Sequence, residues 1–324
     1  MSQRSSSLLL LQTLNPFDSP SMPTRFPQIL LGAALLPWRD DFTLDELQFR
    51  EHIRNIVRHG FQHIYLMGTA GEGYALTDHQ FQQVVQVFWE EMQQPGLHPM
   101  VGVISMSMGR ILERIAWAHS VGIRHFQISL PSWGAQTDSE MMTFFQGVCG
   151  AFPDSQFLHY NLPRTKRMVT GREYRRIADA VPNLVATKNS TSDFARIADL
   201  MTHAPDLQHV FVENAFAMGC LFGECSLLPS YGLLFPKLAQ RHFETGRAQR
   251  TAELMELHKQ IGEIVPKLFG HIQEPRIDGA YDKLFAWLRT PDFPLRLLPP
   301  YQGFNATEAT IAREALLKHF PGWD

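Results

Sequence analysis

The sequence has few cysteines and no long hydrophobic run, and each shortage excludes a class of protein. Its three cysteines, Cys149, Cys220 and Cys225, are too few for a disulfide framework, and none has the Cys-x-x-Cys spacing of a zinc or redox site. So low a count favours a reducing compartment, and we expect a cytoplasmic protein. No apolar run approaches the roughly 18 residues that a membrane span needs, so no membrane partner is expected.

Charge is also sparse and mixed in sign. Charged residues make up 19% of the 324 residues, and the net charge is −3. The chain has neither a basic stripe of the kind that binds nucleic acid nor an acidic block. Its 14 histidines include no His-Glu-x-x-His and no His-x-His cluster, so no metal site is expected. We therefore predict a small-molecule ligand held by local groups.

Residues 1–26 lie outside the regular pattern of the chain and are predicted to be an N-terminal extension. Within them, Leu8 to Leu11 could be taken for the apolar part of a signal peptide. The run is short, Gln12 interrupts it, and no small-residue cleavage site follows. We interpret the segment as an extension of the domain.

Eight short apolar runs alternate with segments of helical periodicity from about residue 27, which predicts a parallel sheet. Near-continuous apolar runs are typical of parallel strands that are buried on both faces. Eight repeats between residues 27 and 237 fit a closed (β/α)8 barrel better than an open sheet. The predicted strands are Ile29–Leu36, His63–Met67, Met100–Ile104, His125–Leu130, Phe157–Tyr160, Leu184–Thr187, His209–Val212 and Ser226–Leu228.

Helix signals support the same division. Capping-box spacing of a hydroxyl residue and an acid or amide three positions later occurs at Thr43, Thr77 and Thr137. Beyond the barrel the pattern is helical only, so residues 238–324 are predicted to form a helical region packed on the barrel. Its predicted helices cover Ala248–Phe269, Ala280–Leu288 and a last segment that Asn305 and Glu308 open.

The polar residues that end the strands are the candidates for chemistry, because active sites of such barrels lie there. Lys188 directly follows an apolar strand. Burial disfavours the ammonium form, so we expect the pKa of Lys188 to be lowered. A neutral amine can attack a ketone and form an imine, which stabilises a carbanion on the neighbouring carbon. A solvated lysine at a strand end is the simpler alternative.

Two further strand ends carry groups that suit the same site. Tyr160 ends the preceding strand, and neighbouring strands lie about 4.8 Å apart, so its phenol is expected within reach of a group on Lys188. The loop Gly68–Gly73 offers backbone amides and the hydroxyl of Thr69, which together suit a carboxylate. It lacks the pattern of a phosphate loop. Taken singly, Tyr160 is also compatible with a core aromatic, and the loop with an ordinary turn.

Together these motifs resemble the dihydrodipicolinate synthase and N-acetylneuraminate lyase family of class I aldolase-like enzymes. The family's Gly-Thr/Ser-Thr-Gly-Glu loop is similar to Gly68–Glu72, and its Tyr-Asn-x-Pro motif to Tyr160–Pro163. Its lysine followed five residues later by aspartate matches Lys188 and Asp193, and Gly223–Pro236 resembles its segment around the eighth strand. The resemblance covers roughly residues 27–320.

This resemblance implies a role for each residue. Lys188 would form a Schiff base with pyruvate or another 2-oxo acid, and Tyr160 would relay protons. Thr69, with the amides of Ala70 and Gly71, would hold the substrate carboxylate. Leu228, at the end of the eighth strand, would contact the substrate. Family members use no metal or organic cofactor and are commonly tetramers, so a homo-oligomer, tetramer or dimer, is expected.

The chain also departs from the family's pattern, and the departures concern the substrate. Ala70 replaces a hydroxyl residue of the loop. Ser132 and Trp133 stand where a tyrosine from a partner subunit often extends the proton relay. Thr165 stands where the synthases have an arginine for the second substrate's carboxylate. Glu213 and Asn214 resemble the polar pair with which sialic acid lyases hold sugar hydroxyls, although a solvated loop is equally compatible.

Three functions remain open at this point. The first is a Schiff-base lyase, an aldolase or a dehydratase, acting on pyruvate or a 2-keto-3-deoxy sugar acid. A dihydrodipicolinate synthase that condenses pyruvate with aspartate semialdehyde is the second. The third is a non-catalytic relative that binds a small acid, suggested by Ala70 and Trp133. A phosphate-binding barrel has no supporting motif after the seventh or eighth strand.

Overall fold

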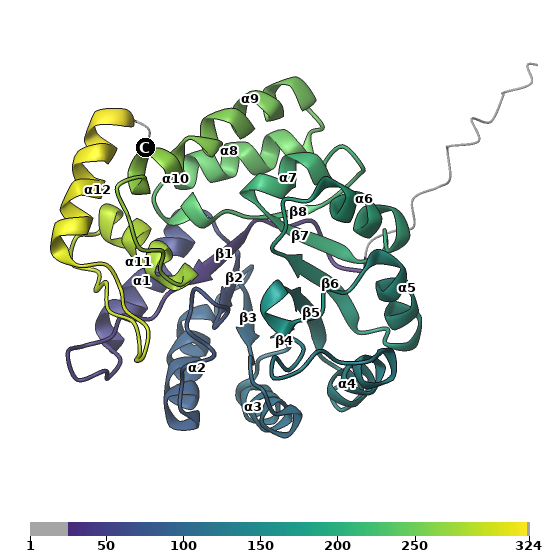
Figure 1. Ribbon diagram of the computed structural model, residues 1–324. Coiled ribbons are helices and arrows are strands. Elements are labelled where there is room, and N and C mark those ends of the chain that lie inside the picture. Colours follow the sequence, from purple (N-terminus) through teal and green to yellow (C-terminus); the bar gives the residue numbers. More distant parts are fainter. Residues whose placement is uncertain (1–24, 323–324) are drawn as a thin grey trace, which may run out of the picture.

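Eight parallel strands close into a barrel in the computed structural model, which describes residues 25–322 of the chain. The strands pair in chain order, and a bridge between Leu30 and Leu227 joins the last strand to the first. The (β/α)8 prediction is confirmed (Figure 1). The strands are β1 Leu31–Ala34, β2 His63–Leu66, β3 His98–Gly102, β4 His125–Ile128, β5 Gln156–Asn161, β6 Leu184–Asn189, β7 Gln208–Val212 and β8 Ser226–Leu228.

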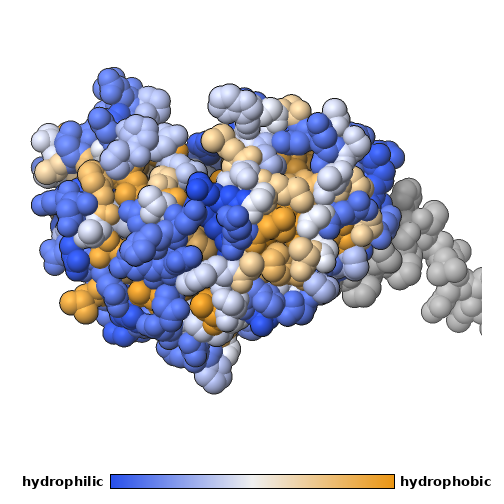
Figure 2. All heavy atoms as spheres, turned by 90° about the horizontal axis from the view of Figure 1, so that it is seen from below, coloured by the Kyte–Doolittle hydropathy of each residue, from blue (hydrophilic) through white to orange (hydrophobic). Residues whose placement is uncertain are grey.

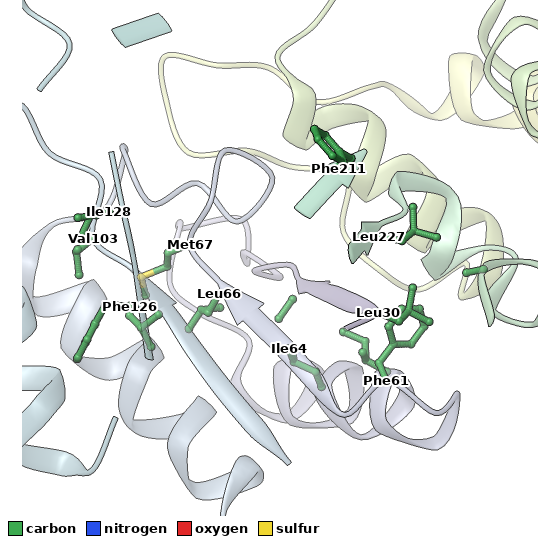
Figure 3. Close-up of a cluster of buried hydrophobic side chains, with 14 of the residues drawn as sticks. Leu30, Phe61, Ile64, Leu66, Met67, Val103, Phe126, Ile128, Phe211 and Leu227 are labelled. Atoms are coloured by element: carbon green, nitrogen blue, oxygen red, sulfur yellow. The ribbon is translucent and has the colours of Figure 1, made fainter. Parts of the chain in front are cut away.

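Alternate residues of each strand point into the barrel and out toward the helices, which accounts for the near-continuous apolar runs. On β2, Tyr65 belongs to the inner cluster with Leu31 and Leu158, while Ile64 and Leu66 belong to the outer layer. Figure 3 shows part of this outer layer. Both layers are almost fully buried, so the strands are fixed from both sides.

One helix follows each strand around the barrel, and four more follow at the C-terminal end. The helices around the barrel are α1 Glu46–Arg58, α2 Asp78–Met92, α3 Met108–Val121, α4 Asp138–Gly150, α5 Gly171–Ala180, α6 Phe194–His203, α7 Glu213–Gly219 and α8 Pro236–Arg247. Those of the C-terminal region are α9 Thr251–Gly262, α10 Ile264–Phe269, α11 Asp278–Arg289 and α12 Ala306–His319. Figure 1 shows the four C-terminal helices gathered on one side of the barrel.

Of the helix starts predicted from capping residues, all but one are observed. Thr77 and Thr137 cap α2 and α4 with complete capping boxes, and Asn305 caps α12 in the same way. The prediction that Thr43 caps α1 is wrong, because its hydroxyl donates to Asp41 instead. Asp45 caps α1 and accepts from the amide of Gln48 at 3.2 Å.

The C-terminal region differs from the prediction in detail. The predicted segment Ala248–Phe269 consists of α9 and α10, which meet at Glu263. Pro266 explains the break, since its ring excludes the carbonyl four residues earlier, that of Gly262, from a regular helix. The predicted boundary at residue 237 falls within α8.

The outer surface is mostly polar, with scattered hydrophobic patches on the face that Figure 2 shows. Among the described residues, no helix is long and apolar enough to cross a membrane. The three cysteines are buried, and the Sγ atoms of Cys220 and Cys225 lie 3.7 Å apart. The apolar run Leu8–Leu11 and most of the predicted N-terminal extension lie outside the described residues.

Candidate active site

Lys188 lies on β6 and is only 4% exposed. Its Nζ donates a hydrogen bond to the phenol oxygen of Tyr65 at 2.8 Å. The same nitrogen lies 3.9 Å from the ring centre of Tyr160 and 4.6 Å from that of Tyr65. Two aromatic rings and one hydroxyl therefore surround the amine, which leaves it few polar contacts within the protein.

Tyr160 lies on β5 at the position that pairs with Lys188 in the sheet, as the strand spacing predicts. Its phenol oxygen is 3.5 Å from the Thr69 hydroxyl and accepts a hydrogen bond from Ser190 at 3.3 Å. The structure thus brings together the three residues for which the sequence predicts catalytic roles. Ser190, two residues beyond Lys188, is an additional contact that sequence reasoning missed.

The electrostatics of Lys188 differ from the prediction. Burial lowers the pKa of its ammonium, but the phenols of Tyr160 and Tyr65 and the carboxyl of Asp282 favour the charged form and outweigh burial. The net pKa of Lys188 is raised, so the predicted lowering is wrong. The sequence could not show these neighbours, because they come from β2, β5 and α11.

The pKa of Tyr160 moves in the opposite direction. Burial of the phenol raises its pKa, but the charge of Lys188 and the hydrogen bonds from Ser190 and Thr69 outweigh burial and leave it lowered. The lowered pKa of Tyr160 increases the share of its phenolate form, which can accept a proton from the ammonium of Lys188 and return it.

Tyr65 is the second residue that the sequence analysis missed. It lies on β2 and points into the barrel, with its hydroxyl on the amine of Lys188. Gly68 makes room for it, since a Cβ at position 68 would lie 2.5 Å from Cε2 and 2.7 Å from the hydroxyl of Tyr65. The first glycine of the loop therefore has a packing role beside the lysine.

A cavity of about 190 Å³ opens beside this group of residues. Its wall includes the residues predicted as catalytic, together with Ala70, Leu228 and several residues that the sequence analysis did not single out. The described residues that line it are Gly32, Ala33, Ile56, Phe61, Tyr65, Thr69, Ala70, Tyr160, Lys188, Ser190, Val212, Leu228, Pro229, Ser230, Gly232, Leu233, Asp278 and Asp282.

The loop after β2 presents amides near this cavity. Among the described residues, no acceptor takes a hydrogen bond from the amide of Ala70 or of Gly71, although both residues are buried. Buried amides without a protein partner are suited to an anionic ligand. The Thr69 hydroxyl, 3.5 Å from Tyr160, adds a donor on the same loop.

A buried ion pair anchors this loop to the C-terminal region. Glu72, whose φ is 54°, pairs with Lys283 of α11 at 2.6 Å, and both side chains are fully buried. The carboxylate of Glu72 also accepts from the indole of Trp38 at 2.9 Å and from the amide of Leu298 at 2.6 Å. The helices after the barrel thus hold the loop in place.

Three predicted substrate contacts lie outside the cavity of a single chain. Trp133 is 82% exposed, and its carbonyl accepts from Lys166 at 2.8 Å. Ser132 next to it does not line the cavity. Thr165 is buried, but its hydroxyl donates to the carbonyls of Leu162 and Arg167 at 2.8 Å and closes its own turn.

The predicted polar pair at the start of α7 also lies outside the cavity wall. Glu213 accepts from the hydroxyl of Ser230 at 2.5 Å and from its amide at 3.1 Å, so both carboxylate oxygens hold the segment after β8. Asn214 is exposed and does not line the cavity. Ser230 lines the cavity in place of this pair.

Two acids of α11 complete the cavity wall. Arg164 binds Asp278 through two hydrogen bonds, of 3.0 and 2.9 Å. Asp282, one turn further along the helix, lines the cavity and is partly buried. Burial, with smaller contributions from Asp278 and Glu213, raises the pKa of Asp282 to about 8. Within residues 25–322, no group of three His, Cys, Asp or Glu residues is placed to bind a metal ion.

The fold and the site together define a (β/α)8-barrel protein with a buried lysine in a cavity at its strand ends. The chain belongs to the dihydrodipicolinate synthetase family, whose sequence model matches residues 27–278. The predicted family membership is therefore confirmed.

Two curated relatives illustrate the range of the family. A 4-hydroxy-tetrahydrodipicolinate synthase of Helicobacter pylori is 20% identical over 277 residues, which are 83% of this chain and 92% of the relative. A probable 5-dehydro-4-deoxyglucarate dehydratase of Saccharopolyspora erythraea is 26% identical over 186 residues, or 55% of this chain and 58% of the relative. The relatives therefore carry different activities.

Solved structures of the family share the fold. YagE, a prophage protein of Escherichia coli K12 crystallised with pyruvate, has a TM-score of 0.81 and 14% identity, over 90% of this chain and 98% of that one. CdNal of Clostridium difficile, crystallised with mannosamine, has a TM-score of 0.79 and 14% identity, over 90% and 99% of the two chains.

Proposed function

We propose that this protein is a lyase that binds a 2-oxo acid as a Schiff base on Lys188. The observation that carries the proposal is the placement of one buried amine, hydrogen-bonded to a phenol, on the wall of a cavity that also contains Thr69 and Tyr160. The substrate is pyruvate or a 2-keto-3-deoxy sugar acid, and the reaction is aldol cleavage or dehydration.

The substrate carboxylate binds at the loop after β2. The Thr69 hydroxyl and the free amides of Ala70 and Gly71 donate to it, and the ketone then lies toward Lys188. Replacement of a second loop hydroxyl by Ala70 leaves this part of the site with amides and one side-chain donor.

The chemistry begins with a proton leaving Lys188, because its raised pKa keeps the resting amine charged. Tyr65 accepts the hydrogen bond of the ammonium, and the phenolate form of Tyr160, which its lowered pKa favours, takes up the proton. The free amine attacks C2 of the substrate, and Tyr160 returns the proton to the departing water. The resulting iminium accepts the electron pair released when a bond at C3 breaks.

The departures from the synthase pattern favour the sugar-acid substrate. Thr165 stands where the synthases have an arginine, and its hydroxyl is occupied within its own turn. The neighbouring Arg164 is bound to Asp278. A relative at 26% identity is a probable 5-dehydro-4-deoxyglucarate dehydratase, which supports a keto-deoxy sugar acid as the class of substrate. That relative's substrate carries a second carboxylate, for which the described wall of this cavity has no free cation.

A turnover assay on a substrate panel tests this proposal. Purified protein is given a 2-keto-3-deoxy sugar acid in one arm, and pyruvate with aspartate semialdehyde in the other. We expect product in the first arm and its loss in Lys188→Ala. Fast condensation in the second arm would instead identify a synthase. No product in either arm would favour the non-catalytic acid-binding alternative.

We also propose that the chain forms a homo-oligomer, a dimer or a tetramer. Trp133 is 82% exposed on the loop after β4, where the family places a contact between subunits. Analytical ultracentrifugation measures the assembly directly, and a monomer at micromolar concentration would contradict this part of the proposal.

A further inference from the structure

Asp282 is an acid in the cavity that the chemistry at Lys188 does not use. It lies in the second turn of α11, lines the same cavity as Lys188 and Tyr65, and interacts electrostatically with both. Within residues 25–322, no group donates a hydrogen bond to its carboxyl or forms an ion pair with it. The other cavity acid, Asp278, is bound by Arg164.

An unpartnered carboxyl in such a place is costly for the fold. Its partial burial raises the pKa of Asp282 to about 8, because the carboxyl has lost part of its usual hydration. A side chain of this kind on a cavity wall is a candidate for ligand binding. At neutral pH its carboxyl can both donate and accept a hydrogen bond, as an alcohol partner requires.

The position of α11 fixes which part of a ligand Asp282 meets. Gly279 packs the start of the helix against the loop after β2, since a Cβ there would lie 3.0 Å from the carbonyl oxygen of Ala70. Under the proposed function, the carboxylate of a bound 2-oxo acid lies at this loop and its C2 at Lys188. The Asp282 carboxyl is left for the carbon chain beyond C3.

The charges of the cavity wall restrict the far end of that chain. Among the described residues that line the cavity, Lys188 is the only cation, and it is committed to C2. Arg164 is held by Asp278 through two hydrogen bonds. A second substrate carboxylate would find no free cation to compensate its charge, whereas hydroxyl groups can bond with Asp282.

We propose that Asp282 is a specificity-determining residue, which binds hydroxyl groups beyond C3 of the 2-oxo acid in a cavity whose described lining offers no free cation to a second carboxylate. This inference rests on the proposed function. According to this inference, a residue of the helical region after the barrel binds the far end of the substrate.

A matched pair of substrates tests the proposal. The probes are 2-keto-3-deoxygluconate and 5-dehydro-4-deoxyglucarate, which differ in having a primary alcohol or a carboxylate at the far end. We expect kcat/KM of the wild type to favour the alcohol by about tenfold or more. In Asp282→Ala, kcat/KM for the alcohol should fall about tenfold, and the ratio between the two substrates should narrow.

Four controls separate the possible failures. Asp292→Asn, at an exposed position beyond α11, should keep the wild-type ratio. Thermal melts of all variants report folding, and Asp282→Asn keeps the shape of the side chain without its charge. Borohydride trapping of pyruvate on Lys188 reports the Schiff base apart from the far end of the substrate.

The outcomes divide as follows. Absence of trapping in the wild type would refute the proposed function itself. If trapping succeeds, any of three results would overturn the role of Asp282 and leave the Schiff base standing. These are a higher kcat/KM for the dicarboxylate, no turnover of either probe, and a ratio of kcat/KM between the two probes that is unchanged in both Asp282 variants.

Discussion

Two buried lysines occupy two regions of this molecule, and their surroundings are opposite in kind. Lys283 lies at the junction of α11 and the loop after β2, where it pairs with Glu72 at 2.6 Å and donates to the carbonyl of Arg296. Lys188 lies on the cavity wall, with one phenol as hydrogen-bond acceptor and two aromatic rings beside it.

The two lysines differ in the pKa of the amine and in what the amine faces: Lys283 faces an ion-pair partner and Lys188 faces a cavity. Burial is the main reason that the pKa of Lys283 is lowered to about 8, yet its side chain is fully buried against its ion-pair partner Glu72. The pKa of Lys188 is raised, but its neighbours are phenols that exchange protons, and a cavity lies in front of it. Access from a cavity and neighbours that can exchange protons therefore distinguish Lys188, the lysine proposed to be reactive, better than the direction of its pKa shift.

Replacement of Lys188 should have the largest effect on turnover and little effect on stability, unlike replacement of Lys283. In Lys188→Met the nucleophile is lost while the side-chain volume is retained, so turnover should fall roughly a thousandfold or more. The free energy of unfolding should change by less than about 1.5 kcal/mol, since Lys188 forms no salt bridge with a described residue. Steady-state kinetics and urea denaturation measure the two quantities. Residual turnover near the wild-type rate would remove Lys188 from the mechanism.

Replacement of Lys283 should have the reverse effect. Lys283→Met leaves the fully buried carboxylate of Glu72 without its cation, which should cost about 3–5 kcal/mol of unfolding free energy. The double variant with Glu72→Gln should recover part of this loss, because the uncompensated charge is gone. An unchanged denaturation midpoint in Lys283→Met would show that the ion pair does not anchor the loop.

The pH dependence of stability provides a second test of Lys283. Its pKa is about 8 in the folded protein and about 10.5 when unfolded, so the unfolded state holds more protons between these values. The contribution of Lys283 to the free energy of unfolding therefore rises with pH from about 8 to 10.5. The wild type should show this rise relative to Lys283→Met. An equal slope in both proteins would contradict the lowered pKa.

Replacement of Tyr65 should have the smallest effect and should act through Lys188. The hydrogen bond that Tyr65 accepts helps to raise the pKa of Lys188, so Tyr65→Phe should lower that pKa. The acidic limb of the rate of Schiff-base formation should then move to lower pH by about one unit or less. Tyr281→Phe, outside the cavity wall, is the matched control. A shift to higher pH would contradict this role.

The fold was predictable because buried parallel strands leave a clear pattern. All eight predicted strands overlap observed ones, since each apolar run lies between two hydrophobic layers. Local competition caused the errors. Thr43 has capping spacing, but Asp41 takes its hydroxyl, and Pro266 divides a segment whose apolar periodicity looks continuous.

The candidate site was predictable only where the residues follow strands. Lys188 and Tyr160 end neighbouring strands, so their meeting follows from the sheet. Tyr65 lies inside a strand whose sequence is typical of a buried core strand. Only the barrel shows that its side chain points inward, toward Lys188. Asp282 comes from a helix after the barrel, and no periodicity in the sequence indicates which strand ends that helix covers.

Borohydride reduction in the presence of pyruvate, followed by mass mapping of the peptides, measures the central claim most directly. We expect a single reduced pyruvate adduct on the peptide that contains Lys188, and no adduct on the peptide that contains Lys283. Complete absence of an adduct, or an adduct on any other lysine, would contradict the assignment of Lys188 as the reactive amine.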